Sequence, residues 1–400
     1  MESRNDKINK MIMHAYDTVP FYKKVYDGMG KQAIKIENLP IINKQQMIYS
    51  RESMLSSKYI GKYIRKNLNW TRTSGTSGLQ YEVFWDKEDE KKSLKGLWML
   101  RWKFYGILPE DKLCYFYASD NDEDDFFRDK TKLIVPRKTL YDGSLAEKYK
   151  EIKDFAPKWM ILQPSIAIIL CNLAEKYGVW NELEYIESTG EYLTDVARRR
   201  IENTFKCKVV NQYGTKELNT IAYECPSGNL HIMSDNVYVE NCGNNICVTS
   251  LNNYAMPYVR YKLDDIGIIK SETKCKCGLC GEQLELKECR SMDYIQCKNG
   301  DIKHAYTLIQ LIHKINYHYD GCILQYRIIQ TGYDKFVYEI VLDDDLYSDN
   351  IPEIISTVLL DKTRKRISED CIIDINFTEV LLPEEKSIKF RTFHSLVKNI

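Results

Sequence analysis

One stretch of the sequence consists only of threonine, serine and glycine, and it has the composition of a phosphate-binding loop. Its residues are Thr73, Ser74, Gly75, Thr76, Ser77 and Gly78. Glycines let a backbone approach a ligand closely, and hydroxyls and amides donate hydrogen bonds to phosphate oxygens. The strict phosphate-loop pattern is not met, because leucine rather than lysine follows Gly78. By itself, the stretch is consistent with either a nucleotide loop or a surface turn.

A second group of residues has the types and spacing of a metal site. Cys225 and His231 are separated by five residues, and the later segment KCKCGLCGE supplies Cys275, Cys277 and Cys280. Thiolates and imidazole beside turn-forming Gly and Pro suit a tetrahedral zinc. We favour Cys225, His231, Cys275 and Cys277 as ligands, with Cys280 as a substitute. Four protein ligands would make the zinc structural, and the alternative is a set of unligated thiols.

The segments around these residues alternate between strand and helix patterns. The patterns predict a helix over 91–107, strands over 112–119 and 158–165, a helix over 166–178, a strand over 183–190, a helix over 193–205 capped near Thr194, and a strand over 208–214. Such repetition indicates a largely parallel sheet, with ligands bound at the loops that follow the strands. Two of these loops contain Gly190 with Glu191, and Tyr213 with Glu217.

The types of predicted element change in the second half of the chain. From about residue 236 the sequence indicates hairpins, and after a break near 290–300 it predicts a helix over 305–319, strands over 321–332 and 335–342, and a helix over 350–367. We therefore predict an α/β protein with two domains. Residues 1–291 form a large N-terminal domain with mostly parallel sheets and a β-rich subregion that holds the zinc knuckle at 225–280. Residues 292–400 form a small, mobile C-terminal α+β domain.

The composition of the chain bears on its binding partners and on its location in the cell. Lys plus Arg and Asp plus Glu number 57 each in 400 residues, so no net charge attracts nucleic acid or an anionic membrane. The amino terminus has no signal-peptide pattern and no apolar run of about 18 residues occurs, which predicts a cytoplasmic location. The 13 cysteines suit reduced thiols with one metal site better than a disulfide framework.

The chemical motifs follow one another in a distinctive order. After the 73–78 stretch come STGEYLT (188–194), NQYGTKEL (211–218), YVRYKLDDIG (258–267), ECRSMDYI (288–295) and a lysine in KSIKFRTF (386–393). This order resembles the adenylate-forming superfamily, and most closely its phenylacetate–CoA ligase branch with the capsule-biosynthesis-type members. The resemblance covers nearly the whole chain.

The resemblance implies an enzyme that joins a small carboxylic acid to ATP, releases pyrophosphate and passes the acyl group to the thiol of CoA. Two alternatives stay open. The acceptor can be an amine of an amino acid or sugar, which makes an amide ligase, or the chain can be a catalytically lapsed nucleotide-binding module. The implied cofactors are ATP and magnesium beside the structural zinc, and a homodimer is left open.

The resemblance also implies a role for individual residues. Residues 73–78 would bind the β- and γ-phosphates. The backbone of Gly190 and Glu191 would line the adenine, Tyr213 would stack on it, and Gly214 and Thr215 would also belong to the nucleotide site. Glu217 matches the magnesium carboxylate, and Asp265 matches the acid that binds the ribose hydroxyls. Arg290 matches the arginine near the domain hinge. Lys389 matches the mobile lysine that contacts the carboxylate and the α-phosphate.

Several positions depart from the family pattern. Leu79 replaces a frequent lysine, a loss for which Arg72 is the candidate to compensate, and Met292 replaces the hinge aspartate beside Asp293. Glycines of the pattern are replaced at Asp264, Cys289 and Ile388. These departures motivate the lapsed alternative, and they bear on domain rotation and acyl transfer more than on the nucleotide pocket.

The acid pocket is the least specified part of the sequence. Candidates to line it lie between residues 101 and 190 and include Trp102, Tyr115, Tyr117 and Gln163. Aromatic side chains at such spacing more often belong to a hydrophobic core, which is the alternative for these positions.

Overall fold

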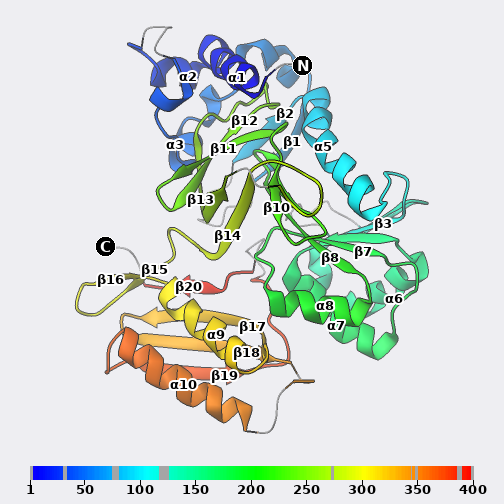
Figure 1. Ribbon diagram of the computed structural model, residues 1–400, viewed down its shortest axis with the longest axis vertical. Coiled ribbons are helices and arrows are strands. Elements are labelled where there is room, and N and C mark those ends of the chain that lie inside the picture. The colour runs from blue at the N-terminus through cyan, green and yellow to red at the C-terminus, as the bar shows by residue number, and fades with distance from the viewer. Residues whose placement is uncertain are drawn as a thin grey trace. The chain divides into compact units, whose positions relative to one another are not determined.

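The chain folds into two compact units (Figure 1). The computed structural model describes residues 3–29, 34–73, 81–116, 126–271, 274–343, 345–346, 350–384 and 390–397. The first unit combines residues 1–111 with 210–286, and the second combines 112–209 with 287–400. The domain boundary that we expect between 291 and 292 stays a prediction.

The first unit begins with helices and ends with strands. Its elements are α1 (Arg4–Thr18), α2 (Pro20–Val25), α3 (Lys44–Tyr49), α4 (Ile60–Ile64), β1 (Asn69–Arg72), β2 (Glu82–Trp85), α5 (Lys87–Tyr105), β8 (Lys208–Thr215), β9 (Asn219–Glu224), β10 (Leu230–Ile232), β11 (Val237–Cys242), β12 (Asn245–Ser250), β13 (Tyr261–Lys270) and β14 (Gln283–Arg290). Strands β8 and β14 cross the unit boundaries at one end. The amino-terminal helices bury Met11, Ile12 and Tyr22 against the strands in one hydrophobic core.

The strands of the first unit confirm the β-rich subregion. They follow the order β11-β12-β13-β14-β10-β9-β8. The β8–β9, β9–β10, β10–β14, β11–β12 and β12–β13 pairs are antiparallel. Gly243 turns the β11–β12 hairpin at φ +65°, a left-handed conformation that glycine adopts without strain.

The second unit contains the predicted strand–helix repetition. Its first elements are β3 (Leu113–Phe116), β4 (Phe127–Arg128), β5 (Lys132–Val135), the short 3-10 helix η5 (Arg137–Leu140), α6 (Leu145–Phe155), β6 (Trp159–Leu162), α7 (Pro164–Tyr177), β7 (Tyr185–Thr189) and α8 (Asp195–Phe205). The order β7-β6-β3-β5-β4 is parallel except at β4. Helices α7 and α8 pack beside each other over a core that includes Leu162 and Ile201. Gln163 and Gly190 follow the carboxyl ends of the neighbouring strands β6 and β7, and Arg137 follows β5, from which β6 is separated by β3.

Local signals set most helix ends in this unit, with one correction to the predicted boundaries. The Thr194 hydroxyl accepts the amide of Ala197 at 3.1 Å and caps α8 as expected. Gly178 ends α7, also as expected. Pro164 and Ser165 were expected to end a strand, but Pro164 is the first residue of α7. Its missing amide costs nothing there, because the first helical amides have no partner within the helix.

The C-terminal part of the second unit is the small α+β domain of the predicted fold class. It contains β15 (Tyr294–Gln296), β16 (Ile302–His304), α9 (Tyr306–His318), β17 (Ile323–Gly332), β18 (Lys335–Leu342), α10 (Ile351–Arg366), β19 (Ile372–Phe377) and β20 (Phe393–Ser395). Its four-stranded sheet has the order β19-β18-β17-β20. Helices α9 and α10 lie side by side on one face of this sheet (Figure 1).

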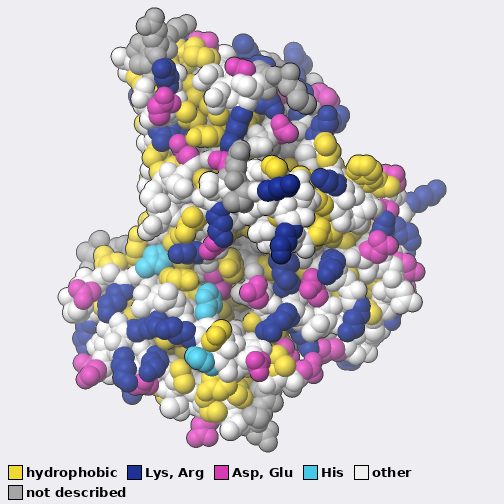
Figure 2. Space-filling model, in the orientation of Figure 1, with side chains coloured by type: hydrophobic (Ala, Val, Ile, Leu, Met, Phe, Trp, Pro, Cys, Tyr) yellow, Lys and Arg dark blue, Asp and Glu magenta, His cyan; other side chains and the backbone are white. Residues whose placement is uncertain are grey.

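The charges on the surface agree with the equal numbers of basic and acidic residues in the sequence. Basic and acidic side chains are interspersed over the face that Figure 2 shows. Among the described residues, no helix is both long enough and apolar enough to cross a membrane. All 13 cysteines are described, and each is a free thiol.

Candidate functional site

The predicted phosphate loop joins two paired strands. Strands β1 and β2 are antiparallel, with Arg72 opposite Glu82. Thr73 is buried, and its hydroxyl accepts the amide of Tyr81 at 3.2 Å. Ser74, Gly75, Thr76, Ser77, Gly78 and Leu79 lie outside the described residues. Arg72, our candidate for a compensating charge, pairs with Glu82 at 3.6 Å, and both side chains are about half exposed.

The loop after β7 holds Gly190 and Glu191, which the resemblance assigns to the adenine. Gly190 has φ +83°, and its backbone packs close to the side chain of Gln163. The Glu191 carboxylate accepts the Ser165 amide at 3.1 Å and the Ser165 hydroxyl at 3.0 Å. Ser165 lies in the first turn of α7, where a negative charge is favoured by the helix dipole. The side chain of Glu191 therefore caps α7, a role that the sequence did not indicate.

The turn between β8 and β9 holds Tyr213, Gly214 and Thr215. The strand pairing shifts register between Tyr213 and Gly214, and Asn219 closes the turn with φ +55°. The Thr215 hydroxyl is buried, and it forms no hydrogen bond with any described residue. A buried hydroxyl without a partner costs free energy unless a ligand or water supplies one.

Gly214 is required by packing, which gives a first prediction. A Cβ atom at this position would overlap the carbonyl oxygen of Asn219, a backbone atom that the hairpin holds in place. We expect Gly214→Ala to lower the free energy of unfolding by about 1–3 kcal/mol in urea denaturation. Gly61→Ala in α4 is the control, because a Cβ there meets only the Arg65 side chain, at 3.5 Å or more. Equal unfolding free energies for the two variants would contradict this steric role.

Glu217 is held by phenol groups from other segments of the first unit. The carboxylate is buried, and its Oε1 accepts the hydroxyl of Tyr81 at 3.1 Å and that of Tyr261 at 3.3 Å. The Tyr258 hydroxyl lies 3.4 Å from the Tyr81 hydroxyl. Burial, followed by the Glu217 charge, raises the pKa of all three tyrosines well above the usual value, so they remain donors. The sequence did not indicate this tyrosine group, since Tyr81 is far from Tyr258 and Tyr261 along the chain.

Asp265 lies beside Tyr213, as their predicted roles on one nucleotide require. The Tyr213 hydroxyl donates to the Asp265 carboxylate at 2.7 Å. Asp265 belongs to β13, the same strand that supplies Tyr261 to Glu217. Three predicted residues, Tyr213, Glu217 and Asp265, are thus connected within the first unit.

The hinge candidate Arg290 is the last residue of β14, in the second unit. Its amide donates to the Asp293 carboxylate at 3.0 Å, and its carbonyl accepts from His304 Nε2 at 2.9 Å. Burial raises the pKa of Asp293. Met292 is exposed, so Asp293 is the residue that closes this turn. Lys389, which the resemblance makes catalytic, lies outside the described residues.

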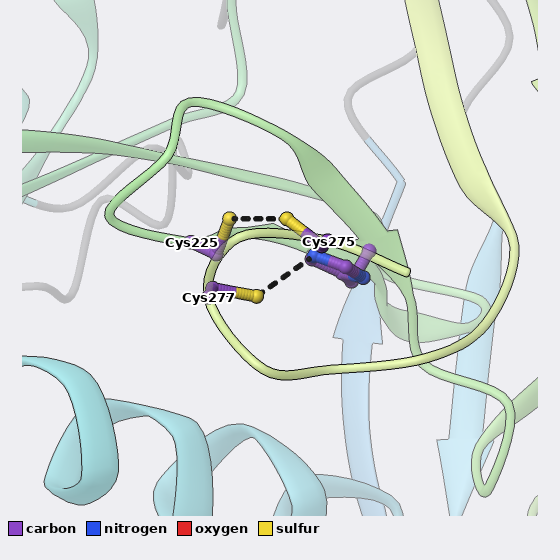
Figure 3. A group of neighbouring side chains, drawn as sticks. Cys225, Cys275 and Cys277 are labelled. Atoms are coloured by element: carbon purple, nitrogen blue, oxygen red, sulfur yellow. Dashed lines mark hydrogen bonds between the residues drawn. The ribbon is translucent and has the colours of Figure 1, made fainter. Parts of the chain in front are cut away.

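The four favoured metal ligands come together in the first unit (Figure 3). One ligand atom from each of Cys225, His231, Cys275 and Cys277 lies within 4.8 Å of the others. Two turns of the same form present the cysteines, because the amides of Cys225 and Cys275 each donate to the carbonyl four residues later. Cys280 is exposed and does not belong to this group.

The spacing of the sulfur and nitrogen atoms fits a tetrahedral zinc ion. With Zn–S of about 2.3 Å and Zn–N of about 2.0 Å, tetrahedral edges measure about 3.8 Å between sulfurs and about 3.5 Å between sulfur and nitrogen. The Cys225–Cys275 sulfurs are 3.8 Å apart, and Cys277 Sγ is 3.4 Å from His231 Nε2 (Figure 3). The amide of Cys277, assisted by His231, lowers the pKa of the Cys275 thiol to about 6. These hydrogen bonds favour the thiolate form of Cys275, which is the form that binds zinc.

The candidates for an acid pocket have different surroundings. Gln163 is buried at the end of β6, and its amide oxygen has no hydrogen-bond partner among the described residues. Trp102 is 63% exposed on α5, a position unlike that of a core aromatic. Tyr115 is half-buried on β3, and Tyr117 lies outside the described residues.

The sequence is similar to a known protein over part of its length. No family model matches the sequence. Protein CapK of Staphylococcus aureus is 24% identical over 174 residues, which is 40% of this chain and 36% of CapK. The chain thus spans about a third of the length of the curated relative it matches.

Solved structures match over nearly the whole chain. A 2-hydroxyisobutyryl-CoA ligase in the postadenylation state, in complex with R3-HIB-AMP, superposes with a TM-score of 0.74 and 14% identity over 98% of this chain and 88% of the ligase. An open conformation of that ligase, in complex with 2-HIB-AMP and CoA, gives a TM-score of 0.62 and 14% identity over 98% and 90% of the two chains.

These matches show the fold of the chain. The chain has the fold of this 2-hydroxyisobutyryl-CoA ligase. The resemblance to the superfamily is confirmed at the level of the fold, and the phenylacetate–CoA ligase branch stays a prediction.

Proposed function

We propose that the chain is an ATP-dependent ligase that activates a small carboxylic acid. The carboxylate oxygen attacks the α-phosphorus of ATP, the bond to the β-phosphate oxygen breaks, and acyl-adenylate and pyrophosphate form. The acyl carbon is then attacked by the thiol of CoA, with AMP as the leaving group. The acid itself is not specified by the residues.

The arrangement of three side chains supports this proposal in addition to the fold. The β8–β9 turn presents Tyr213 and Glu217, and the Tyr213 hydroxyl bonds to Asp265 on β13. An aromatic ring, a carboxylate for ribose hydroxyls and a carboxylate for a metal are the groups that ATP requires. The unsatisfied hydroxyl of Thr215 on the same turn supports a ligand there.

Glu217 fits the role of a magnesium ligand. Carboxylate oxygens are the hard ligands that magnesium prefers. The two phenol groups hold Oε1, and Oε2 receives no hydrogen bond from the described residues. Magnesium bound here would neutralise phosphate charge during adenylation.

The second proposed metal is a structural zinc at Cys225, His231, Cys275 and Cys277. It would tie the turn after β9 to the loop between β13 and β14. Four protein ligands leave no position open for substrate, so the ion would support the fold and take no part in catalysis.

Metal content gives the second prediction. We expect the purified protein to retain about one zinc per chain after dialysis, as measured by plasma mass spectrometry. Cys275→Ser should reduce the zinc content to a small fraction of this value and lower the melting temperature. Cys280→Ser is the matched control, because this thiol lies outside the ligand group. Zinc retained by Cys275→Ser but lost from Cys280→Ser would contradict the assignment.

The acyl acceptor and the lapsed alternative need separate tests. An amine of an amino acid or sugar is the alternative acceptor, which competition between CoA and amine pools would reveal. A lapsed nucleotide-binding module should bind ATP in a calorimetric titration without releasing pyrophosphate in the presence of any acid. Acid-dependent release together with binding supports the enzyme. The cytoplasmic location and a homodimer stay predictions.

A further inference from the structure

Three consecutive backbone carbonyls near the C-terminus each accept a hydrogen bond from a side chain of the second unit. Arg327 Nη2 donates to the carbonyl of Leu382 at 2.6 Å, and the Tyr141 hydroxyl donates to that of Pro383 at 2.7 Å. Arg137 Nη2 donates to the carbonyl of Glu384 at 2.8 Å. The same Nη2 donates to the Tyr141 hydroxyl at 2.9 Å, so these two side chains act as a pair.

A fourth contact lies a few residues further along the chain. The amide of Phe390 donates to Glu191 Oε1 at 2.9 Å. This carboxylate also accepts hydrogen bonds from the amide and the hydroxyl of Ser165 on α7. The Phe390 ring lies 4.9 Å from the guanidinium of Arg327. We call Arg137, Tyr141 and Glu191 the tail contact group, since all three bind the backbone of residues 382–390.

The tail contact group is polar, and its members are buried (Arg137) or partly buried (Tyr141 and Glu191). Arg137 is 5% exposed, forms no ion pair with a described carboxylate, and has an unpartnered Nη1. Burying a guanidinium without a carboxylate is expensive, and apolar contacts would attach the tail at lower cost. Hydrogen bonds to backbone atoms instead fix the position of a segment, because they depend on distance and direction.

The contacts bracket the segment that contains the predicted catalytic lysine, because Phe390 directly follows Lys389 in the sequence. We propose that Arg137, Tyr141 and Glu191 are positioning residues that dock the backbone at Pro383, Glu384 and Phe390 for the adenylation half-reaction. This inference rests on the proposed function. One peptide bond joins Phe390 to Lys389. Fixing the backbone at Phe390 would therefore reduce the entropy that the lysine side chain loses in reaching the transition state.

The test compares Glu191→Ala with Ser165→Ala. Both variants lose hydrogen bonds at the start of α7, but only Glu191→Ala loses the contact to Phe390. Glu191→Ala should lower kcat of acid-dependent pyrophosphate–ATP exchange by about 10- to 100-fold. The KM for ATP should change by less than about 3-fold, because the resemblance assigns the backbone of Glu191, and not its side chain, to the adenine. Glu191→Gln, which retains an acceptor oxygen, should recover part of kcat. Ser165→Ala should keep a kcat within about 2-fold of the unsubstituted protein.

Hydrogen exchange of the Phe390 amide gives a readout that does not depend on activity. Exchange should accelerate by about 10-fold in Glu191→Ala and by less than about 2-fold in Ser165→Ala. Unchanged kcat in Glu191→Ala, or a lowered kcat with unchanged exchange at Phe390, would overturn the docking role. If the unsubstituted protein shows no pyrophosphate exchange while Phe390 exchange still accelerates in Glu191→Ala, the proposed function fails and the docking contact stands.

Discussion

Glu217→Gln is expected to lower the rate of acyl-adenylate formation by about 100- to 1,000-fold, which is the loss typical of one preorganised group that stabilises transition-state charge. Glutamine is nearly the same size and keeps an oxygen for the two phenol groups, so the fold should persist. What it removes is the negative charge that we assign to magnesium. The variant should therefore also need more magnesium for half-maximal activity.

The matched control for Glu217 is Tyr81→Phe. This change removes one hydrogen bond to Oε1 but leaves the carboxylate and the Tyr261 contact. We expect a loss of stability of about 1 kcal/mol and a much smaller loss of activity than in Glu217→Gln. Pyrophosphate release and urea denaturation measure the two quantities. Equal activity in Glu217→Gln and the unsubstituted protein would remove Glu217 from the site.

Lys389→Ala is the second substitution with a large expected effect. A positive charge at this position would stabilise the charge that develops between the acid and the α-phosphate. Its loss should slow adenylation by about 100- to 1,000-fold. Lys386→Ala, three residues earlier in the same segment, is the control and should keep most of the activity. Single-turnover formation of acyl-adenylate compares the two variants.

The outcome for the two lysines separates a specific role from a general effect of charge. Similar losses in Lys386→Ala and Lys389→Ala would indicate only that the segment needs positive charge. An unchanged adenylation rate in Lys389→Ala would contradict its predicted role. Thermal unfolding of both variants is the control that separates a loss of activity from a loss of the fold.

The fold was largely predictable because local signals and hydrophobic patterns agreed in most segments. The cap at Thr194, the stop at Gly178 and the hairpin before Ser250 each follow from residues within the element. The predicted position of Pro164 at the end of a strand was wrong, because proline also occurs at the first position of helices. The buried polar face of α5, which includes Asp89 and Arg101, was also unexpected. Such a face depends on partners distant in the sequence.

The candidate site was predictable where one motif carries the chemistry. The Cys and His spacing named four ligands that lie in one group, and the resemblance named Tyr213 and Asp265, between which the structure shows a hydrogen bond. The contacts of Glu191 and Glu217 were not predictable. Their partners Ser165 and Tyr81 are identified only once the fold brings separate segments together. Side-chain contacts between distant segments leave no periodic trace in a sequence.

Exchange of labelled pyrophosphate into ATP tests the central claim most directly, since it requires the reversible formation of acyl-adenylate and no knowledge of the acceptor. We predict exchange that depends on both magnesium and one member of a broad panel of carboxylic acids, and that falls sharply in Glu217→Gln and Lys389→Ala. A complete lack of exchange across the panel, with ATP binding intact by calorimetry, would contradict the proposed activity.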